Sequence, residues 1–346
     1  MKLIKKVIGV DISKDDFKVR FGTLDQNLEQ KLSKCFVFAN NPKGFNLFLK
    51  TIQKVHYFNS EDAASMEVPI WIVMEATGVY YENLAYYLAK NNYLLSVVLP
   101  NKMRSFANTL ENKSKTDAID AANQTIFGLE KPLKAWTAPP EIFKELKELA
   151  REYLSIQESI SIIKNKLHAK SHSYQANKGT VKRLKQQKGF LTKQLKEVLD
   201  QIKKLIKSDD ELSQKINNVT TIIGVGLITV VTAIAETNGF DLIKNKNQLA
   251  SYAGYDIVQN ESGKYIGKTK ISKKGNSNLR RAFYMPALSA ARYNKKLKEL
   301  YIRLCKTKAN KKIALIAVAR KLLLLVYFLW KKNETFNPNY DNIKTA

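Results

Sequence analysis

Short apolar runs with strand-like spacing occupy the first hundred residues. Residues 7–11 form a compact apolar run that ends in an acid, and residues 17–21 alternate between apolar and basic side chains. Residues 35–39 are again strand-like, while residues 69–74 and 94–99 are apolar runs typical of buried strands. These patterns predict three short strands followed by two buried ones.

Helices are expected between and after these strands. Pro42 opens one helix, and a second follows the motif Glu75-Ala-Thr-Gly. Further helices are expected near residues 101–110 and 116–128. Because strands alternate with helices, we expect residues 1–130 to form one domain with an α/β layer fold.

A long helical segment follows the proline pair Pro139-Pro140. Residues 141–208 contain no proline, and their apolar side chains recur at helical spacing among Lys, Glu and Gln. A break near Asn177 predicts two long helices that form an antiparallel hairpin or coiled-coil arm, assigned to residues 131–215. The arm is either a solvated spacer or a basic surface that follows a nucleic-acid backbone.

Residues 216–346 are predicted to form a mainly helical domain. Within residues 216–235 the pattern is helix, tight turn, helix, with Gly224 and Gly226 in the turn. This resembles a helix-hairpin-helix element, in which glycines let backbone N–H groups point at a phosphate. A packing turn between buried helices has the same pattern. Further helices are expected at 246–253, 276–293 and 309–331, with a hairpin or loop at 255–271.

The net charge narrows the class of partner. The chain has 346 residues, with 58 Lys and Arg against 31 Asp and Glu, which gives +27. Residues 131–346 carry 42 basic and 17 acidic side chains, whereas residues 1–130 carry 16 and 14. Such an excess favours DNA or RNA over a small neutral substrate. A Lys-rich surface from a genome of biased composition would give the same net charge, so the charge alone does not establish a nucleic-acid partner.

Cysteine usage and hydropathy exclude other classes. Cys35 and Cys305 are the only cysteines and lie far apart, which disfavours a disulfide framework or zinc site and fits a cytoplasmic protein. The apolar run at 313–330 is interrupted by Arg320 and Lys321. It is too short and too charged to span a bilayer, so no membrane is expected as a partner.

Four acids stand out by their positions. Asp11 and Glu75 each end a predicted buried strand, and strand ends are where functional groups emerge in open α/β sheets. Asp117 and Asp120 are three residues apart, which places them on one face of a helix. Oxygen ligands of this kind hold Mg²⁺, and paired ions serve phosphodiester chemistry. Each acid alone reads equally well as a capping or surface residue, so the prediction rests on the set.

Other titratable residues are weaker candidates. Asp15 and Asp16 read as residues of a hairpin turn, with Asp15 as the alternative to Asp11. His168 and His172 are four residues apart on a predicted helix, but no third ligand accompanies them. We therefore expect both histidines to be surface residues.

A basic, glycine-containing segment spans residues 254–281. Its glycines and hydroxyl side chains would let it approach a sugar-phosphate backbone closely. Ser262 precedes Gly263 in this segment and could act as a nucleophile, although a serine in such a position is ordinarily a turn residue. The basic side chains expected to contact nucleic acid are Lys264, Lys268, Lys270, Lys273, Lys274, Arg280 and Arg281, together with the turn glycines Gly224 and Gly226.

These blocks occur in one recognisable order along nearly the whole chain. The first three are Val-Ile-Gly-Val-Asp11, Met-Glu75-Ala-Thr-Gly and Lys-Thr-Asp117-Ala-Ile-Asp120-Ala. The later ones are Ile-Gly-Val-Gly, Gly-Tyr-Asp, Glu-Ser262-Gly-Lys and Ile-Ser-Lys-Lys-Gly-Asn-Ser-Asn-Leu-Arg-Arg. Together they resemble the insertion-sequence one-ten family of DEDD transposases, also called bridge-RNA-guided recombinases.

The resemblance implies a fold and a set of catalytic residues. The N-terminal domain would be RuvC-like, with a ribonuclease H-like fold, and its four acids would bind Mg²⁺, two ions per site with Mn²⁺ as a substitute. The arm would mediate oligomer contacts, from dimer to tetramer. The C-terminal transposase domain would carry the serine nucleophile, which corresponds to Ser262, with Ser272 and Ser277 as rivals.

The resemblance also implies partners and a reaction. A structured non-coding bridge RNA would pair with donor and target double-stranded DNA, and the enzyme would act near the nucleoid of a bacterium or archaeon. Two other classes remain open from the residues alone. One is a structure-specific, Mg²⁺-dependent endonuclease of Holliday-junction type, without a covalent intermediate. The other is a non-catalytic nucleic-acid-binding protein.

Overall fold

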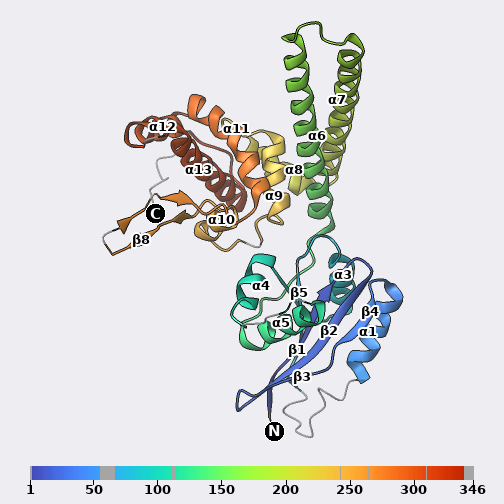
Figure 1. Cartoon of the computed structure of the whole chain (residues 1–346). Helices are drawn as coiled ribbons and strands as arrows, with labels where there is room; N and C mark the ends of the chain where they lie inside the picture. The colour runs from blue at the N-terminus through green and yellow to red at the C-terminus, as the bar shows by residue number, and fades with distance from the viewer. Residues whose placement is uncertain are drawn as a thin grey trace. The chain divides into compact units, whose positions relative to one another are not determined.

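The computed structural model describes residues 2–54, 67–110, 114, 116–241, 243–263, 265–267, 269–308 and 310–338. The chain divides into two compact units, Met1–Ala138 and Pro139–Ala346. The first is a mixed α/β layer structure and the second is mainly helical (Figure 1), which confirms the two predicted fold classes. The further division of the second unit into an arm and a C-terminal domain at residue 215 stays a prediction.

One mixed sheet forms the centre of the first unit. Among the described residues its order is β3-β2-β1-β5-β6, and β4 pairs with the other end of β2. Strand β1 runs antiparallel to β2 and parallel to β5, and β5 runs parallel to β6. The strands are β1 (Leu3–Ile12), β2 (Asp16–Asp25), β3 (Gln30–Leu32), β4 (Phe36–Ala39), β5 (Ile70–Glu75) and β6 (Leu94–Val98).

Helices cover both faces of this sheet, which explains the continuous apolar runs of its inner strands. On one face, Ile8 and Ile72 belong to an apolar cluster with α1 and α3. On the other face, their neighbours Val7 and Val73 pack with Phe106 and other side chains of α4 and α5. The helices are α1 (Pro42–Lys54), α3 (Glu82–Lys90), α4 (Pro100–Ala107) and α5 (Asp117–Glu130).

Helix α5 lies against β1 because two glycines allow a close approach. A Cβ atom on Gly9 would lie 2.3 Å from Thr125 Oγ1 and 2.4 Å from the Ala121 carbonyl oxygen. A Cβ atom on Gly128 would lie 2.4 Å from Val7 Cγ1. Later residues of α5 therefore face earlier residues of β1, so the first turn of the helix lies toward the C-terminal end of that strand.

The second unit is helical apart from a small β-hairpin. The predicted helical pair is present, and Asn177 caps the second helix by accepting a hydrogen bond from the backbone N–H of Thr180 at 2.9 Å. The helices are α6 (Glu141–Ser171), α7 (Lys178–Lys207), α8 (Asp210–Thr220), α9 (Leu227–Glu236), α10 (Lys246–Tyr252), α11 (Ser277–Tyr293), α12 (Lys295–Thr307) and α13 (Lys311–Lys332). The short strands are β7 (Ile257–Val258), β8 (Glu261–Ser262), β9 (Tyr265–Ile266) and β10 (Lys270–Ile271).

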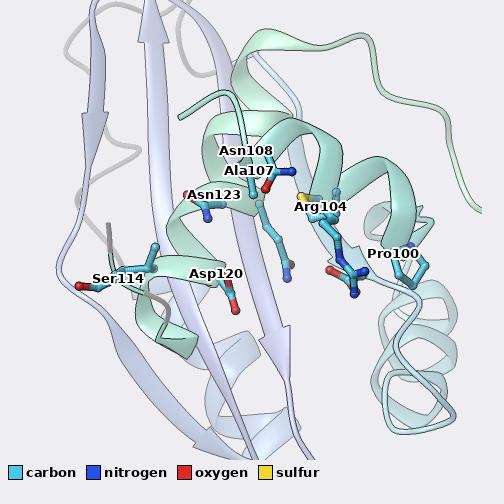
Figure 2. Close-up of a pocket in the computed structure, with 11 residues that line it drawn as sticks. Pro100, Arg104, Ala107, Asn108, Ser114, Asp120 and Asn123 are labelled. Atoms are coloured by element: carbon cyan, nitrogen blue, oxygen red, sulfur yellow. The ribbon is translucent and has the colours of Figure 1, made fainter. Parts of the chain in front are cut away.

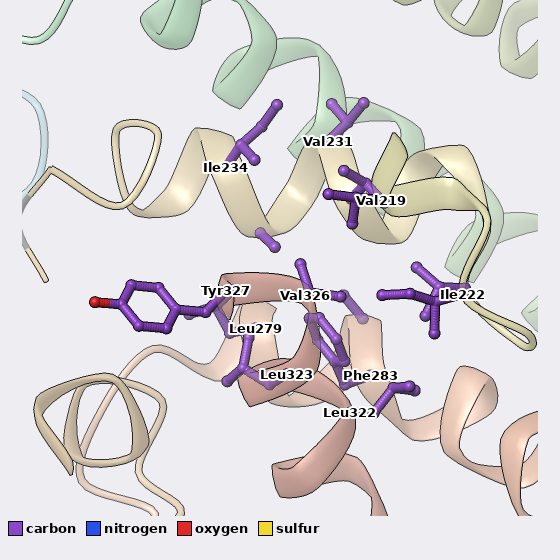
Figure 3. Close-up of a cluster of buried hydrophobic side chains, with 14 of the residues drawn as sticks. Val219, Ile222, Val231, Ile234, Leu279, Phe283, Leu322, Leu323, Val326 and Tyr327 are labelled. Atoms are coloured by element: carbon purple, nitrogen blue, oxygen red, sulfur yellow. The ribbon is translucent and has the colours of Figure 1, made fainter. Parts of the chain in front are cut away.

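Helix α13 belongs to the core of this unit. Figure 3 shows side chains of α8, α9, α11 and α13 meeting, including Val219, Ile234, Phe283 and Val326. All four are fully buried. Helix α13 is long and apolar enough to cross a bilayer by length and composition, so the expectation that this run is too short and too charged was wrong. However, 56% of its most apolar window is buried by the protein itself. Its apolar character is therefore accounted for by core packing.

A buried carboxylate ties α6, α9 and α11 together. Glu236, at the end of α9, is 3% exposed. Its carboxylate accepts two hydrogen bonds from the Arg151 guanidinium, at 2.7 and 2.9 Å. The side-chain amides of Asn276 and Asn278 donate to it at 2.7 and 2.9 Å. Burial alone would raise the pKa of Glu236, but the hydrogen bonds from Arg151 and Asn276 hold the pKa below its ordinary value.

Candidate metal centre and nucleic-acid interface

Two of the predicted acids lie side by side at the end of the parallel strands. Asp11 is near the C-terminal end of β1 and Glu75 is the last residue of β5. The register pairs Val10 with Met74, so the next residue on each strand is one of these acids. Glu75 also accepts a hydrogen bond from the hydroxyl of Thr77 at 2.8 Å. The edge of the sheet thus presents two adjacent, half-buried carboxylates.

The other two acids come from the first turn of α5. Thr116 caps this helix by accepting a hydrogen bond from the backbone N–H of Ile119. Asp117 and Asp120 follow the cap, where the positive end of the helix dipole favours negative side chains. Since the glycine contacts of Gly9 set this turn toward the end of β1, the helix brings both acids toward Asp11.

The pKa of Asp11 reflects the proximity of the other three acids. Burial of its carboxyl is the largest of the effects that raise the pKa of Asp11 to about 7, from an ordinary value of 3.8. Three neighbouring carboxylates add to this effect, those of Asp120, Asp117 and Glu75. The ammonium of Lys18 acts in the opposite direction. The four acids therefore share one electrostatic environment.

The raised pKa has a defined consequence for stability without metal. Between about pH 4 and pH 7 the folded protein keeps a proton on Asp11 that the unfolded chain has already released. The free energy of unfolding therefore falls as the pH rises through this window. Above pH 7 the folded protein has to hold Asp11 as an anion beside the other acids, and a bound cation would add to the relief that Lys18 provides.

Lys18 is a member of the site that sequence reasoning missed. Its ammonium donates a hydrogen bond to Asp117 and forms an ion pair with it. This hydrogen bond is the largest of the effects that raise the pKa of Lys18. Lys18 on β2 is the cross-strand partner of Asp11 on β1. The alternating pattern of the first hairpin could have indicated this pairing once its register was known.

The residues present fit a hard divalent cation. In the described part of the chain, no three Asp, Glu, His or Cys side chains are close enough to hold one ion as they stand, and Asp117 is engaged by Lys18. The donors are nevertheless carboxylate oxygens, which hard cations prefer. Gln124 shares this environment, since its Nε2 donates a hydrogen bond to Asp11 at 3.4 Å while its buried Oε1 has no hydrogen-bond partner among the described residues.

A cleft of about 320 Å³ adjoins the acids between α4 and α5. Figure 2 shows Arg104 and Asn108 entering it from α4 and its C-terminal end, with Asp120 and Asn123 entering from α5. Glu75 also lines the cleft. Sequence reasoning did not single out Arg104, Asn108 or Asn123, because nothing in the local pattern of α4 indicates which side chains face the acids.

Ser262 lies at the tip of the predicted hairpin. Strand β7 pairs with β10, and β8 pairs with β9, with Ser262 opposite Tyr265. Gly263 has a φ of +55°, which explains a glycine in the turn directly after the serine. Ser262 is exposed. Asp15, in contrast, lies in the turn between β1 and β2, and Asp16 is the first residue of β2, directly after that turn.

The rival serines lie away from this tip. Ser272 follows β10, where its backbone N–H donates to the carbonyl of Asp256 and its hydroxyl accepts from the backbone N–H of Lys274 at 3.3 Å. Ser277 is the first residue of α11, directly after the cap Asn276. Both therefore belong to the junction between the hairpin and α11.

The predicted basic contacts fall into two groups. Lys270, Lys273 and Lys274 are exposed. The Arg280 guanidinium donates to backbone carbonyls of residues 253, 275 and 276, and the Arg281 guanidinium forms an ion pair with Glu158 of α6 at 2.7 Å. Both arginines thus brace the start of α11. Lys264 and Lys268 lie outside the described residues.

The glycine turn connects α8 to α9 as predicted. Gly224 has a φ of +96°, and a Cβ atom there would lie 2.8 Å from the backbone nitrogen of Ala290 in α11. Gly226 is the N-cap of α9, and a Cβ atom there would meet open space. Gly224 is therefore required for packing, whereas Gly226 leaves the N-terminus of α9 open. His168 and His172 lie at the exposed end of α6.

Comparison with known proteins gives a consistent result across the chain. Residues 8–174 match a family model of DEDD type described as "Transposase", and residues 216–302 match one described as "Transposase IS116/IS110/IS902 family". A pilin gene-inverting protein of Moraxella bovis is 29% identical over 340 residues, covering 96% of this chain and 98% of the relative. A pilin gene-inverting protein of Moraxella lacunata is 28% identical over 337 residues, with the same coverage.

The fold, the acids and these matches define an enzyme of DNA transposition and recombination that acts on DNA. The chain belongs to the IS110 family of transposases. The DEDD domain implies dependence on a divalent metal, typically Mg²⁺. The predicted family and the predicted enzyme class are thereby confirmed.

Proposed function

We propose that this transposase cuts and exchanges DNA strands at a Mg²⁺ site held by Asp11, Glu75, Asp117 and Asp120. The observation that carries the proposal is the convergence of Asp120, Asp117 and Glu75 on Asp11. Burial, and after it these three carboxylates, raise the pKa of Asp11 to about 7. When bound, Mg²⁺ would neutralise the scissile phosphate and stabilise the charge that develops there, with two ions per site and Mn²⁺ as a substitute. The acids provide the oxygen ligands, and α5 holds two of them in place.

Ser262 is the proposed nucleophile. Its oxygen forms a bond to the scissile phosphorus while one phosphorus–oxygen bond to a deoxyribose breaks. The serine loses its proton, and the departing sugar oxygen takes up a proton to become a hydroxyl. One phosphodiester is exchanged for another, so the strand can be rejoined without an energy source. The exposed position of Ser262 at a hairpin tip supports this role, because the tip can reach a DNA backbone.

A structured RNA from the element is the proposed guide. Pairing of this RNA with donor and target duplexes would supply the sequence specificity, while the protein holds backbone and shape. The charge of +27 supports a body that binds several nucleic-acid strands. The basic side chains proposed to neutralise phosphates are Lys264, Lys268, Lys270, Lys273 and Lys274, with Arg280 and Arg281 bracing them and the turn at Gly224 and Gly226 as a further backbone contact.

The relatives favour strand exchange over simple cutting. The relatives are named for inversion of a pilin gene, an outcome that requires DNA ends to be rejoined.

The proposed RuvC-like, ribonuclease H-like fold is supported by a sheet in which an antiparallel hairpin is followed by parallel strands. We also propose that the α6–α7 pair mediates assembly into dimers and tetramers that hold both duplexes, with the enzyme acting in the cytoplasm at the nucleoid.

Replacing Ser262 by alanine is expected to abolish the covalent protein–DNA adduct and all recombinant product. The reaction contains donor and target duplexes, Mg²⁺ and the RNA transcribed from the DNA that flanks the gene. Adducts are detected by gel shift after denaturation, and products by sequencing across the junction. The exposed hairpin tip should tolerate the change, so the melting temperature should match that of the wild type.

Matched variants separate the proposed role from the alternatives. Ser272→Ala and Ser277→Ala should keep the adduct, and omission of the RNA should remove sequence-specific product from the wild type. If Ser262→Ala cuts DNA at the wild-type rate, the protein is a metal-dependent endonuclease without a covalent step. If the adduct is lost in Ser272→Ala and kept in Ser262→Ala, the assignment of the nucleophile is wrong.

A further inference from the structure

We propose that the cleft between α4 and α5 is a nucleotide subsite, in which Arg104 binds a DNA phosphate next to the scissile one and the side-chain amides bind the attached base. The proposal rests on the proposed function, because it takes the acids beside the cleft as the place of strand cleavage. Its basis is the chemistry of the cleft walls other than Glu75 and Asp120, which belong to the proposed metal site.

The position of the cleft ties it to the reaction. Glu75 and Asp120 line both the cleft and the proposed metal site, so the two share a wall. A DNA strand whose scissile phosphate lies at the acids has to place a neighbouring nucleotide within a few ångströms of them. The cleft of about 320 Å³ is at the lower end of the range of about 300–1,000 Å³ for small-molecule sites, which suits one nucleotide and excludes a duplex.

Arg104 gives this cleft a cation where its other charged walls are acids. The side chain is exposed, and no ion pair or side-chain hydrogen bond of Arg104 is found within the described part of the chain. A guanidinium beside Glu75 and Asp120 that pairs with neither is available for an anion. The planar guanidinium matches phosphate oxygens with two parallel hydrogen bonds. A phosphate is the anion that every nucleotide of the substrate supplies.

The remaining walls suit a base. Met103 and Ile119 are apolar and would contact the faces of an unstacked ring. Asn108, Asn123 and Gln124 present carboxamides, which pair with the edges of bases. Gln124 is 1% exposed, and its Oε1 lacks a hydrogen-bond partner among the described residues. A donor at the floor of the cleft, from a base or a bridging water, would satisfy this oxygen.

The test compares loss of the guanidinium with loss of the phosphate charge. Binding of a fluorescent recombination-site duplex is measured in Ca²⁺ with the guide RNA, for the wild type and Arg104→Gln. Duplexes carry a neutral methylphosphonate at one of the phosphates on either side of the scissile bond. Arg104→Gln should weaken binding of the unmodified duplex by about tenfold. One methylphosphonate position should weaken wild-type binding similarly and leave Arg104→Gln binding unchanged.

A control variant isolates the effect of position from that of charge. Lys90→Gln removes one positive charge from α3, which covers the opposite face of the sheet, and should lose affinity equally for every duplex. Asn108→Ala allows a second double-mutant cycle, between this side chain and the base. An abasic nucleotide at the same position should weaken DNA binding by the wild type and leave DNA binding by Asn108→Ala unchanged. Thermal unfolding checks that the variants are folded.

The outcomes are separable from those of the proposed function. The subsite proposal would be overturned if Arg104→Gln bound DNA with wild-type affinity. It would also be overturned if the losses from the substitution and from the methylphosphonate were additive at every position. Neither result depends on strand transfer, because Ca²⁺ supports binding without requiring cleavage. Failure of the proposed function would appear instead as unchanged adduct formation in Ser262→Ala, whatever the result of the Arg104 cycle.

Discussion

Replacing Asp11 by asparagine is expected to lower the rate of DNA strand cleavage at least about a thousandfold, which corresponds to about 4 kcal/mol in the activation free energy. Asp11 is the carboxylate on which Asp120, Asp117 and Glu75 converge. An amide at this position cannot neutralise a divalent cation, and the negative charge at the centre of the ligand set is lost. Single-turnover cleavage with saturating Mg²⁺ measures the effect.

The matched control is Asp15→Asn, the same chemical change four residues away in the exposed turn after β1. It should cleave at the wild-type rate. Metal-free Asp11→Asn should be at least as stable as the wild type at pH 8, because the substitution removes repulsion between carboxylates. A rate within tenfold of the wild type would show that Asp11 is not part of the catalytic site.

Replacing Glu236 by alanine is expected to have the largest effect on stability, a loss of about 2–4 kcal/mol in the free energy of unfolding, because several donors lose a charged acceptor. The substitution removes the carboxylate that accepts from the Arg151 guanidinium and from the side-chain amides of Asn276 and Asn278. Urea unfolding followed by circular dichroism measures the loss. Since Asn276 lies within the basic segment and caps α11, proteolytic cleavage between residues 254 and 276 should also accelerate.

The comparison variant is Glu299→Ala, which removes an exposed carboxylate from α12 in the same unit. It should change the free energy of unfolding by less than about 0.5 kcal/mol. Glu236→Gln keeps the volume and one acceptor oxygen, so its loss should lie between the two. If Glu236→Ala unfolded within about 1 kcal/mol of the wild type, the buried network would not be what holds α9 to α6 and α11.

The four acids could be predicted from sequence because each sits beside a strong local signal. Asp11 and Glu75 end apolar runs, and a three-residue spacing after Thr116 places the others on a capped helix. Lys18 could not be predicted in the same way, because its pairing depends on the hairpin register and on a helix a hundred residues later. Arg104 was missed because nothing in the local pattern of α4 indicates which of its side chains face the acids.

Charge and hydropathy alone were poor guides to the roles of single residues. Arg280 and Arg281 looked equivalent to the lysines before them, yet backbone carbonyls and Glu158 engage their guanidinium groups. Glu236 ends an apolar run and gave no sign of its buried network. Among the elements, β3 is too short and polar to be recognised, and α12 was missed although Asn294 caps it by accepting from the N–H of Leu297.

The most direct test of the central claim is the affinity for Mn²⁺ as a function of pH, measured by calorimetry on the wild type and on Asp11→Asn. Metal binding has to displace the proton that Asp11 keeps up to about pH 7. Wild-type affinity should therefore rise about tenfold per pH unit below 7 and level off above it, and Asp11→Asn should bind weakly without this dependence. Equal affinity in the two proteins at every pH would contradict a metal site built around Asp11.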